Sequence, residues 1–332
     1  MFRKLYGAAA AITLAAAAVT TVAAGPAGAA DPDFRCTNSS TSDSNATPWF
    51  DNHYTVSWAV SRSLLDRHIP QGLATWKDYY GAGKDLLVYT AYGQDGGRAR
   101  IQGIDEADGS LTNYANIRGG HAGGVAIIGS WAFVSGPDGT SVYRYRLDNL
   151  ADVFAGRAGD DVLDGALAGR VGANAFLASE GNVLFAGSFN NDGLGSMHRY
   201  AVNLTTGDLG GASASIEVPK KTQGLTVLPN YFVFATSEGR DNRSNIYVVK
   251  RGYSHLVTSY DNGNLRCVRA PSMAEGVTLS NDRIYQLFES GADCYRYNEA
   301  ECREPTGTPD RVITHLYRTP RSTLVDGLPV LH

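Results

Sequence analysis

The chain has 332 residues, of which 43% are hydrophobic and 19% charged, and its 29 Lys and Arg nearly balance 33 Asp and Glu. A balance this close to neutral, without a run of like charges, argues against nucleic acid or an anionic membrane surface as partner. The 38 glycines and 18 tyrosines are typical of many short strands joined by tight turns.

The N-terminus has the three parts of a secretory signal peptide. Arg3 and Lys4 precede an alanine-dominated apolar stretch over 5–24, Gly25-Pro26 breaks it, and Ala27-Gly28-Ala29 is a small-residue cleavage signal. We therefore expect a signal peptide over 1–29 and a secreted, extracellular product. The alternative is an uncleaved membrane anchor, but alanine is weakly hydrophobic and no second charged flank follows. No later stretch approaches about 18 continuous apolar residues, so we expect no membrane-spanning helix.

Five segments from residue 71 onward share one pattern: a polar or small residue, Gly or Ala, an apolar run, a turn and a second run. The aligned Gly or Ala stands at positions 72, 124, 175, 224 and 276, so the steps are 52, 51, 49 and 52 residues. A third run follows in each unit, over 99–104, 141–147, 197–204, 245–249 and 311–317. A period near 50 with three or four strands per unit predicts an all-β, five-bladed β-propeller.

The ring needs a strand from elsewhere to close it, because the last unit runs out near Pro320. The segment 53–60 reads as a strand, and we predict that it completes the last blade and removes two open edges. The expected organisation is a signal peptide over 1–29, a tail or strap over 30–52 and the propeller over 53–332. The alternatives are a β-sandwich of irregular hairpins, or a sixth blade, since Asp326-Gly327-Leu328 echoes the unit start.

Four cysteines fit an oxidising compartment and allow three pairings. Cys294 and Cys302 bracket a short polar, hairpin-like segment and are expected to pair. That leaves Cys36 with Cys267, which would strap the N-terminal tail to the C-terminal part of the domain. Each bridge would contribute about 2–4 kcal/mol. The metal alternative lacks a CxxC pair and a histidine at ligand spacing.

Loops that enter the innermost strands and loops that leave the second strands should meet on one face of a propeller. The first group places these residues around the channel mouth: Gln71, Gly123, Asn174, Gln223 and Glu275. His121 would replace the side chain that Gly123 lacks. The second group adds Ser135, Ser188, Glu238 and Glu289. The glycines after the polar position would let neighbouring backbones approach closely at the axis.

This ring is expected to bind a small molecule or carbohydrate. Glu275 and Glu289 are candidate acid/base partners for hydrolysis, and His121 is a candidate general base or metal ligand. The plainer alternative is that the carboxylates cap backbone amides or bind channel waters. The sequence has no GxSxG motif, so a serine-hydrolase triad is rejected.

The polar-Gly-apolar unit starts resemble those of secreted propeller proteins, and the mixed amide–carboxylate mouth is similar to that of gluconolactonase-like propellers. The resemblance covers the repeat region. It implies a lactonase-like hydrolase that holds a divalent cation such as Ca²⁺ with Glu, Asn and Asp residues. By position, Glu275 and Asn174 would be the matching ligands. No aspartate occupies an aligned unit start, and Gln replaces Asn in two units.

Three function classes fit this plan. The first is an extracellular hydrolase acting at the channel mouth. The second is a binding module for glycans or cell-wall polymer, with sugars stacking on Trp76 and Tyr79-Tyr80. The third is a scaffold or inhibitor for another secreted protein. We favour the hydrolase, because polar residues recur at the axis in four of the five units, which solubility does not require.

Overall fold

Short hairpins with positive-φ turn residues build every blade of the structure. The computed structural model describes residues 47–252, 265–299, 302 and 308–328, all within the compact unit Pro32–His332. In the second unit, Gly129 adopts a φ of 57° between two strands, and in the fifth, Asn281 and Asp282 adopt 44° and 60°. Such residues give the tight connections that antiparallel hairpins require.

The first two blades are four-stranded antiparallel sheets whose strands follow the chain outward from the axis. Blade 1 consists of β2 (His68–Trp76), β3 (Leu86–Gly93), β4 (Ala99–Asp105) and β5 (Leu111–Ile117). Blade 2 consists of β6 (Val125–Ile128), β7 (Trp131–Ser135), β8 (Ser141–Arg146) and β9 (Ala166–Arg170). The helix α3 (Leu147–Phe154) joins β8 to β9 and packs against β5.

The next two blades repeat this order. Blade 3 consists of β10 (Phe176–Glu180), β11 (Val183–Gly187), β12 (Gly195–Val202) and β13 (Leu209–Ala212), and β14 (Ile216–Val218) also pairs with β12. Blade 4 consists of β15 (Thr222–Val227), β16 (Tyr231–Thr236), β17 (Ser244–Lys250) and β18 (Leu265–Ala270). The chain therefore uses one supersecondary unit four times before it reaches the last blade.

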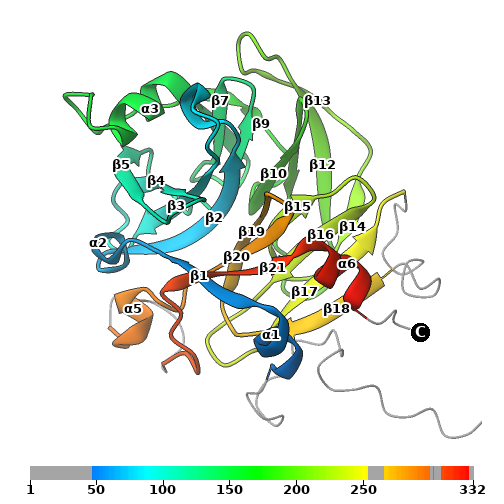
Figure 1. Cartoon of the computed structure of the whole chain (residues 1–332). Coiled ribbons are helices and arrows are strands. Elements are labelled where there is room, and N and C mark those ends of the chain that lie inside the picture. The colour runs from blue at the N-terminus through cyan, green and yellow to red at the C-terminus, as the bar shows by residue number, and fades with distance from the viewer. Residues whose placement is uncertain (1–46, 253–264, 300–301, 303–307, 329–332) are drawn as a thin grey trace, which may run out of the picture. The chain divides into compact units, whose positions relative to one another are not determined.

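Blade 5 combines the two ends of the described chain, as predicted. Its strands are β19 (Ala274–Ser280), β20 (Arg283–Phe288), β21 (His315–Pro320) and, outermost, β1 (Thr55–Ala59). β1 runs antiparallel to β21 with Thr55 opposite Arg318 and Val56 opposite Tyr317, and Figure 1 shows the blue N-terminal strand beside the red C-terminal one. The N-terminal strand thus closes a five-bladed β-propeller.

The five innermost strands form a closed ring around the axis. β2 contacts β6, β6 contacts β10, β10 contacts β15, β15 contacts β19, and β19 contacts β2. The aligned glycines are what allow this approach. A Cβ on Gly124 would lie 2.2 Å from the Leu177 nitrogen, and one on Gly276 would lie 2.3 Å from the Leu73 nitrogen. The predicted close backbone approach at the axis is confirmed.

The described residues form six hydrophobic clusters, five of them packed between neighbouring blades and the sixth between β2 and α5. One example is the cluster between blades 5 and 1, where Tyr89 meets Tyr285 and Leu316. Another lies between blades 4 and 5, where Phe50 of α1 (Pro48–His53) packs against Phe288. Trp76 belongs to the cluster between blades 1 and 2. Each blade therefore buries apolar side chains on both of its faces, and this burial holds the ring of blades together.

The structure corrects the sequence interpretation at three places. The last unit's third strand begins at His315 rather than Arg311, because the preceding backbone leaves the ladder: the Ile313 amide donates to Ser290 Oγ. Residues Arg321–Gly327 form the helix α6, so no sixth blade begins there. Short helices also occur between strands, as α2 (Arg62–Leu65), the 3₁₀ turn η2 (Tyr79–Gly81) and α5 (Asp293–Arg296).

The disulfide prediction is confirmed for Cys294 and Cys302, whose Cα atoms lie 5.7 Å apart. Cys267 is fully buried on β18 and is disulfide-bonded, while Cys36 lies outside the described residues, as do the signal peptide over 1–29 and most of the strap over 30–52. Among the described residues, no helix is long and apolar enough to cross a membrane.

Candidate functional site

The polar unit-start residues lie where the inner strands are irregular. The pairing register shifts between Pro70 and Leu73 of β2, which flanks Gln71, and between Ala274 and Val277 of β19, which flanks Glu275. A third shift, between Thr222 and Gly224, flanks Gln223. Extra residues in a strand re-aim side chains and are common beside functional sites. The repeat therefore places its polar residues at bulges.

Gln71 and Glu289 meet across the seam between blades 1 and 5. Gln71 Nε2 donates to Glu289 Oε2 over 2.9 Å, and the Tyr295 hydroxyl donates to the same oxygen over 3.3 Å. Glu289 follows β20, and its amide donates to the Met273 carbonyl (3.1 Å), which brings it beside the start of β19. Two residues that are 218 positions apart in the chain thus share a hydrogen bond.

Glu275 is buried and in electrostatic contact with Glu289. Its side chain is 1% exposed, and its Oε1 has no hydrogen-bond partner among the described residues. Burial, and then the charge of Glu289, raises the pKa of Glu275 well above its usual range. Burial without a hydrogen-bond donor to Oε1 thus favours the protonated form of Glu275.

Glu289 is poised differently. Burial raises its pKa to about 7, although the hydrogen bonds from Gln71 and Tyr295 and the charge of Arg240 favour the ionised form. Gln71 and Tyr295 both donate to Oε2 of Glu289. Oε1 of the same carboxyl makes no hydrogen bond within the described part of the chain. Glu289 can consequently gain or lose a proton near neutral pH.

An aromatic wall borders the two carboxyls. The hydroxyls of Tyr92 and Tyr295 lie 3.3 Å apart, and burial raises the pKa of both phenols far above their usual range. The ring of Tyr92 stacks on His121, with 4.6 Å between centroids and 23° between planes. The guanidinium of Arg240 lies 4.9 Å from the centre of the Tyr295 ring. We call Gln71, Tyr92, Glu275, Glu289 and Tyr295 the carboxyl cluster.

His121 is exposed at the surface of this wall. Neighbouring atoms nevertheless surround the imidazole closely enough that desolvation lowers its pKa. The ring is therefore neutral at pH 7 and can both donate and accept a hydrogen bond. His121 lies in the loop before β6, and the next residue holds this loop in place. Ala122 adopts a φ of 49°, and its carbonyl accepts a hydrogen bond from the Thr90 hydroxyl (2.8 Å).

The sequence pattern gave no site role to Tyr295, Arg240 or Tyr92. Tyr295 lies on α5, inside the loop that the Cys294–Cys302 bridge closes. A tyrosine inside a short disulfide loop gives no repeat signal, so its approach to Glu289 follows only from the fold. Tyr92 lies on β3 at the exit of the second strand of blade 1, where the other units have Ser or Glu.

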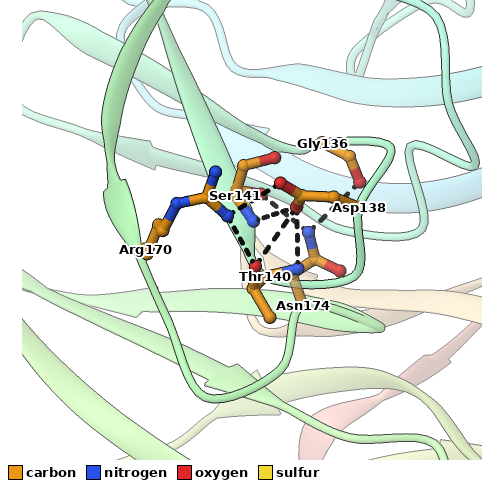
Figure 2. A network of polar contacts seen from close by, with 6 residues as sticks. All are labelled: Gly136, Asp138, Thr140, Ser141, Arg170 and Asn174. Atoms are coloured by element: carbon orange, nitrogen blue, oxygen red, sulfur yellow. Dashed lines mark hydrogen bonds and ion pairs between the residues drawn. The ribbon is translucent and has the colours of Figure 1, made fainter.

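Asn174 has a structural position between blades 2 and 3. Its Nδ2 donates to the carbonyls of Gly136 (3.2 Å) and Ser141 (2.7 Å), as Figure 2 shows. The same loop is held by Asp138, which accepts hydrogen bonds from the Ser141 amide (2.6 Å) and from Arg170 (2.8 Å). The backbone carbonyl of Asn174 also accepts from Ser135 Oγ (2.6 Å).

These contacts bear on the expected metal. The amide nitrogen of Asn174 binds the loop over 136–141. Among the described residues, no group of three or more His, Cys, Asp or Glu side chains could hold a metal ion. The described residues thus offer no carboxylate-rich cluster of the kind that the gluconolactonase-like resemblance implied.

Four further residues of the predicted site have surroundings of their own. Trp76 is 6% exposed and packs edge-on against Tyr79 at the opposite end of β2, so its ring is not the sugar platform that we expected. Glu238 is ion-paired with Lys221. Gln223 is partly buried on β15. Ser188 bonds within its own hairpin, accepting from the Ser196 amide (3.0 Å).

No protein-family model matches the sequence, and no curated protein matches it. Solved structures that resemble it include Kuenenia stuttgartiensis hydrazine synthase (11% identity, TM-score 0.39, 67% of this chain and 56% of that one). The computationally designed Ika8 protein (13%, 0.33, 68% and 70%) is another. A third is a quinoprotein alcohol dehydrogenase-like protein from Bacteroides thetaiotaomicron VPI-5482 (16%, 0.34, 72% and 55%).

The chain spans little more than half the length of the hydrazine synthase and quinoprotein-like chains. At these identities and scores, the likeness says nothing about chemistry. Function must be argued from the site itself.

Proposed function

We propose that the chain is a hydrolase in which Glu289 acts as the general acid–base residue at the channel mouth. The observation that carries this is the geometry of one carboxyl. Glu289 Oε2 is fixed by Gln71 and Tyr295, while Oε1 is free of hydrogen bonds within the described residues. A group that is held on one side and titrates near neutral pH suits proton transfer.

The neighbouring groups support a sugar-like substrate. The rings of Tyr92, His121 and Tyr295 provide flat apolar surface, and their polar atoms, with the unpartnered Oε1 of Gln71, provide donors and acceptors. Apolar walls with a few convergent polar groups are typical of small-molecule sites. A carbohydrate-derived lactone or ester fits this chemistry and agrees with the lactonase-like expectation.

In this reaction the Glu289 carboxylate removes a proton from water as the water oxygen bonds to the acyl carbon. The acyl carbon–oxygen bond then breaks, and the protonated Glu289 returns that proton to the leaving oxygen. Glu275, whose buried side chain is in electrostatic contact with Glu289, touches no reacting atom in this scheme. Glu275 is accordingly a positioning residue, and His121 offers a hydrogen bond to the substrate.

The test uses a panel of aldonolactones, aryl esters and nitrophenyl glycosides. Glu289→Gln preserves shape and should lower kcat by about a hundredfold or more on every active member. Glu217→Gln, on β14 of another blade, should leave the rate unchanged. The wild-type rate should rise with pH through about 7, the pKa of Glu289. Full activity of Glu289→Gln, or no turnover by the wild type on any panel member, would remove the proposal.

Export remains part of the proposal and is supported by the pattern over 1–29. N-terminal sequencing of protein recovered from the culture medium should begin at Ala30. Product retained in the cell with an intact Met1 would contradict it.

A further inference from the structure

A polar cavity lies on the propeller axis, at the ends of the inner strands far from the carboxyl cluster. Its volume is about 140 Å³, and all five inner strands contribute to its lining. β2 contributes Thr75, and Lys77 follows that strand; the other polar lining residues are Ser179, Thr226 and Thr278. The carboxyl cluster contributes nothing to this lining.

The lining contains one ionisable group, and that group is a cation. Lys77 is exposed and makes no ion pair within the described part of the chain. Asp78 and Asp85, the nearest carboxylates in sequence, bond to other groups: Asp78 Oδ1 accepts from the Gly83 amide (2.7 Å), and Asp85 Oδ2 from Ser280 Oγ (3.1 Å). Lys77 is therefore the one charged side chain in the lining of this cavity.

Hydroxyl groups surround the same space. Thr75 and Thr278 are linked through their oxygens (3.1 Å), and Thr75 Oγ1 donates to the Leu279 carbonyl (2.9 Å). Thr226 and Ser179 make no side-chain hydrogen bond among the described residues, so their hydroxyls are free to donate into the cavity. Hydroxyl donors beside an ammonium group are suited to a negatively charged oxygen.

The cavity is separate from the catalytic end. Gln71 and Lys77 are six positions apart along an extended strand, which corresponds to roughly 20 Å. Between them lies the layer where the aligned glycines press against neighbouring backbones, as Gly276 does against Leu73. A ligand at the far end would therefore not touch Glu289.

We infer that this far-end cavity is a binding site for a small tetrahedral oxyanion, with Lys77 as the charged group and Thr226 and Ser179 as hydroxyl donors. The volume admits an ion of the size of phosphate or sulfate and no large ligand. The site is independent of the proposed hydrolase activity, because none of its residues belongs to the carboxyl cluster.

Isothermal titration with inorganic phosphate at low, constant ionic strength tests this inference on the full chain. The wild type should bind phosphate saturably, and Lys77→Gln should weaken binding by about tenfold or more, because a hydrogen bond to a charged group is lost. Thr226→Val should weaken it by about fivefold. Lys84→Gln, an exposed lysine of the same blade that pairs with Asp105, serves as the matched control.

The outcomes are decisive either way. Absence of saturable phosphate binding by the wild type, or equal affinity in Lys77→Gln, would overturn the inference. An equal loss in Lys84→Gln would also overturn it, because the effect would then be one of net charge. Glu289→Gln should bind phosphate like the wild type, so a failed hydrolase test leaves this result interpretable.

Discussion

Replacing Glu289 by Gln tests the electrostatics of the carboxyl cluster through protein stability. A carboxyl whose pKa is higher in the folded than in the unfolded chain makes a contribution that is complete below the unfolded pKa. The contribution is lost as the pH rises through the folded pKa. For Glu289 these values are 4.5 and about 7. The wild type should thus lose stability relative to Glu289→Gln between those values.

Each unit of pKa difference corresponds to about 1.36 kcal/mol of unfolding free energy. The wild type should therefore lose about 2–3 kcal/mol relative to Glu289→Gln between pH 5 and pH 8. His68 acts in the opposite direction, because burial lowers its pKa to about 4 and its contribution grows as the pH rises toward 6.5. The quantity to compare is therefore the difference in unfolding free energy between wild type and variant at each pH, in which the contribution of His68 cancels.

Urea unfolding, followed by tryptophan fluorescence at pH 5, 6, 7 and 8 and constant ionic strength, measures this difference. The gap between Glu289→Gln and wild type should widen in favour of the variant as the pH rises. Glu217→Gln, on β14, should run parallel to the wild type. Parallel curves for Glu289→Gln would refute the claim that Glu289 is buried with its charge largely uncompensated.

Three further outcomes are expected. Gly276→Ala should destabilise the ring by about 1–3 kcal/mol, since the new Cβ would overlap the Leu73 nitrogen. In thermal melts this is a fall in Tm of about 2–5 °C, and Gly211→Ala, with open space around it, should melt like the wild type. Trp76→Ala should cost about 3–5 kcal/mol in urea unfolding, and a near-wild-type midpoint would contradict its place in the core. Deleting residues up to Ala59 should expose the edge of β21 and produce aggregates in size-exclusion chromatography. Elution of the shortened protein as a monomer would contradict the role of β1 in closing the ring.

The sequence alone determined the architecture because the repeat is a local signal. Each unit has its own glycine, apolar runs and turn, so spacing revealed the five blades, and the leftover segment 53–60 revealed how they close. The same alignment located Gln71, Glu275 and Glu289 at one mouth, since equivalent positions of a propeller share one face. The short helices were missed because α3 and α5 lie in connections that follow no period.

Only the tertiary structure decided which polar residues act together. Gln71 and Asn174 hold equivalent unit positions, yet Gln71 donates to Glu289 whereas Asn174 donates to backbone carbonyls of the β7–β8 connection. Tyr295 reaches Glu289 from a connection outside the repeat pattern. A pattern of residue types fixes where a side chain starts, whereas burial, partner and pKa depend on atoms that come from other blades.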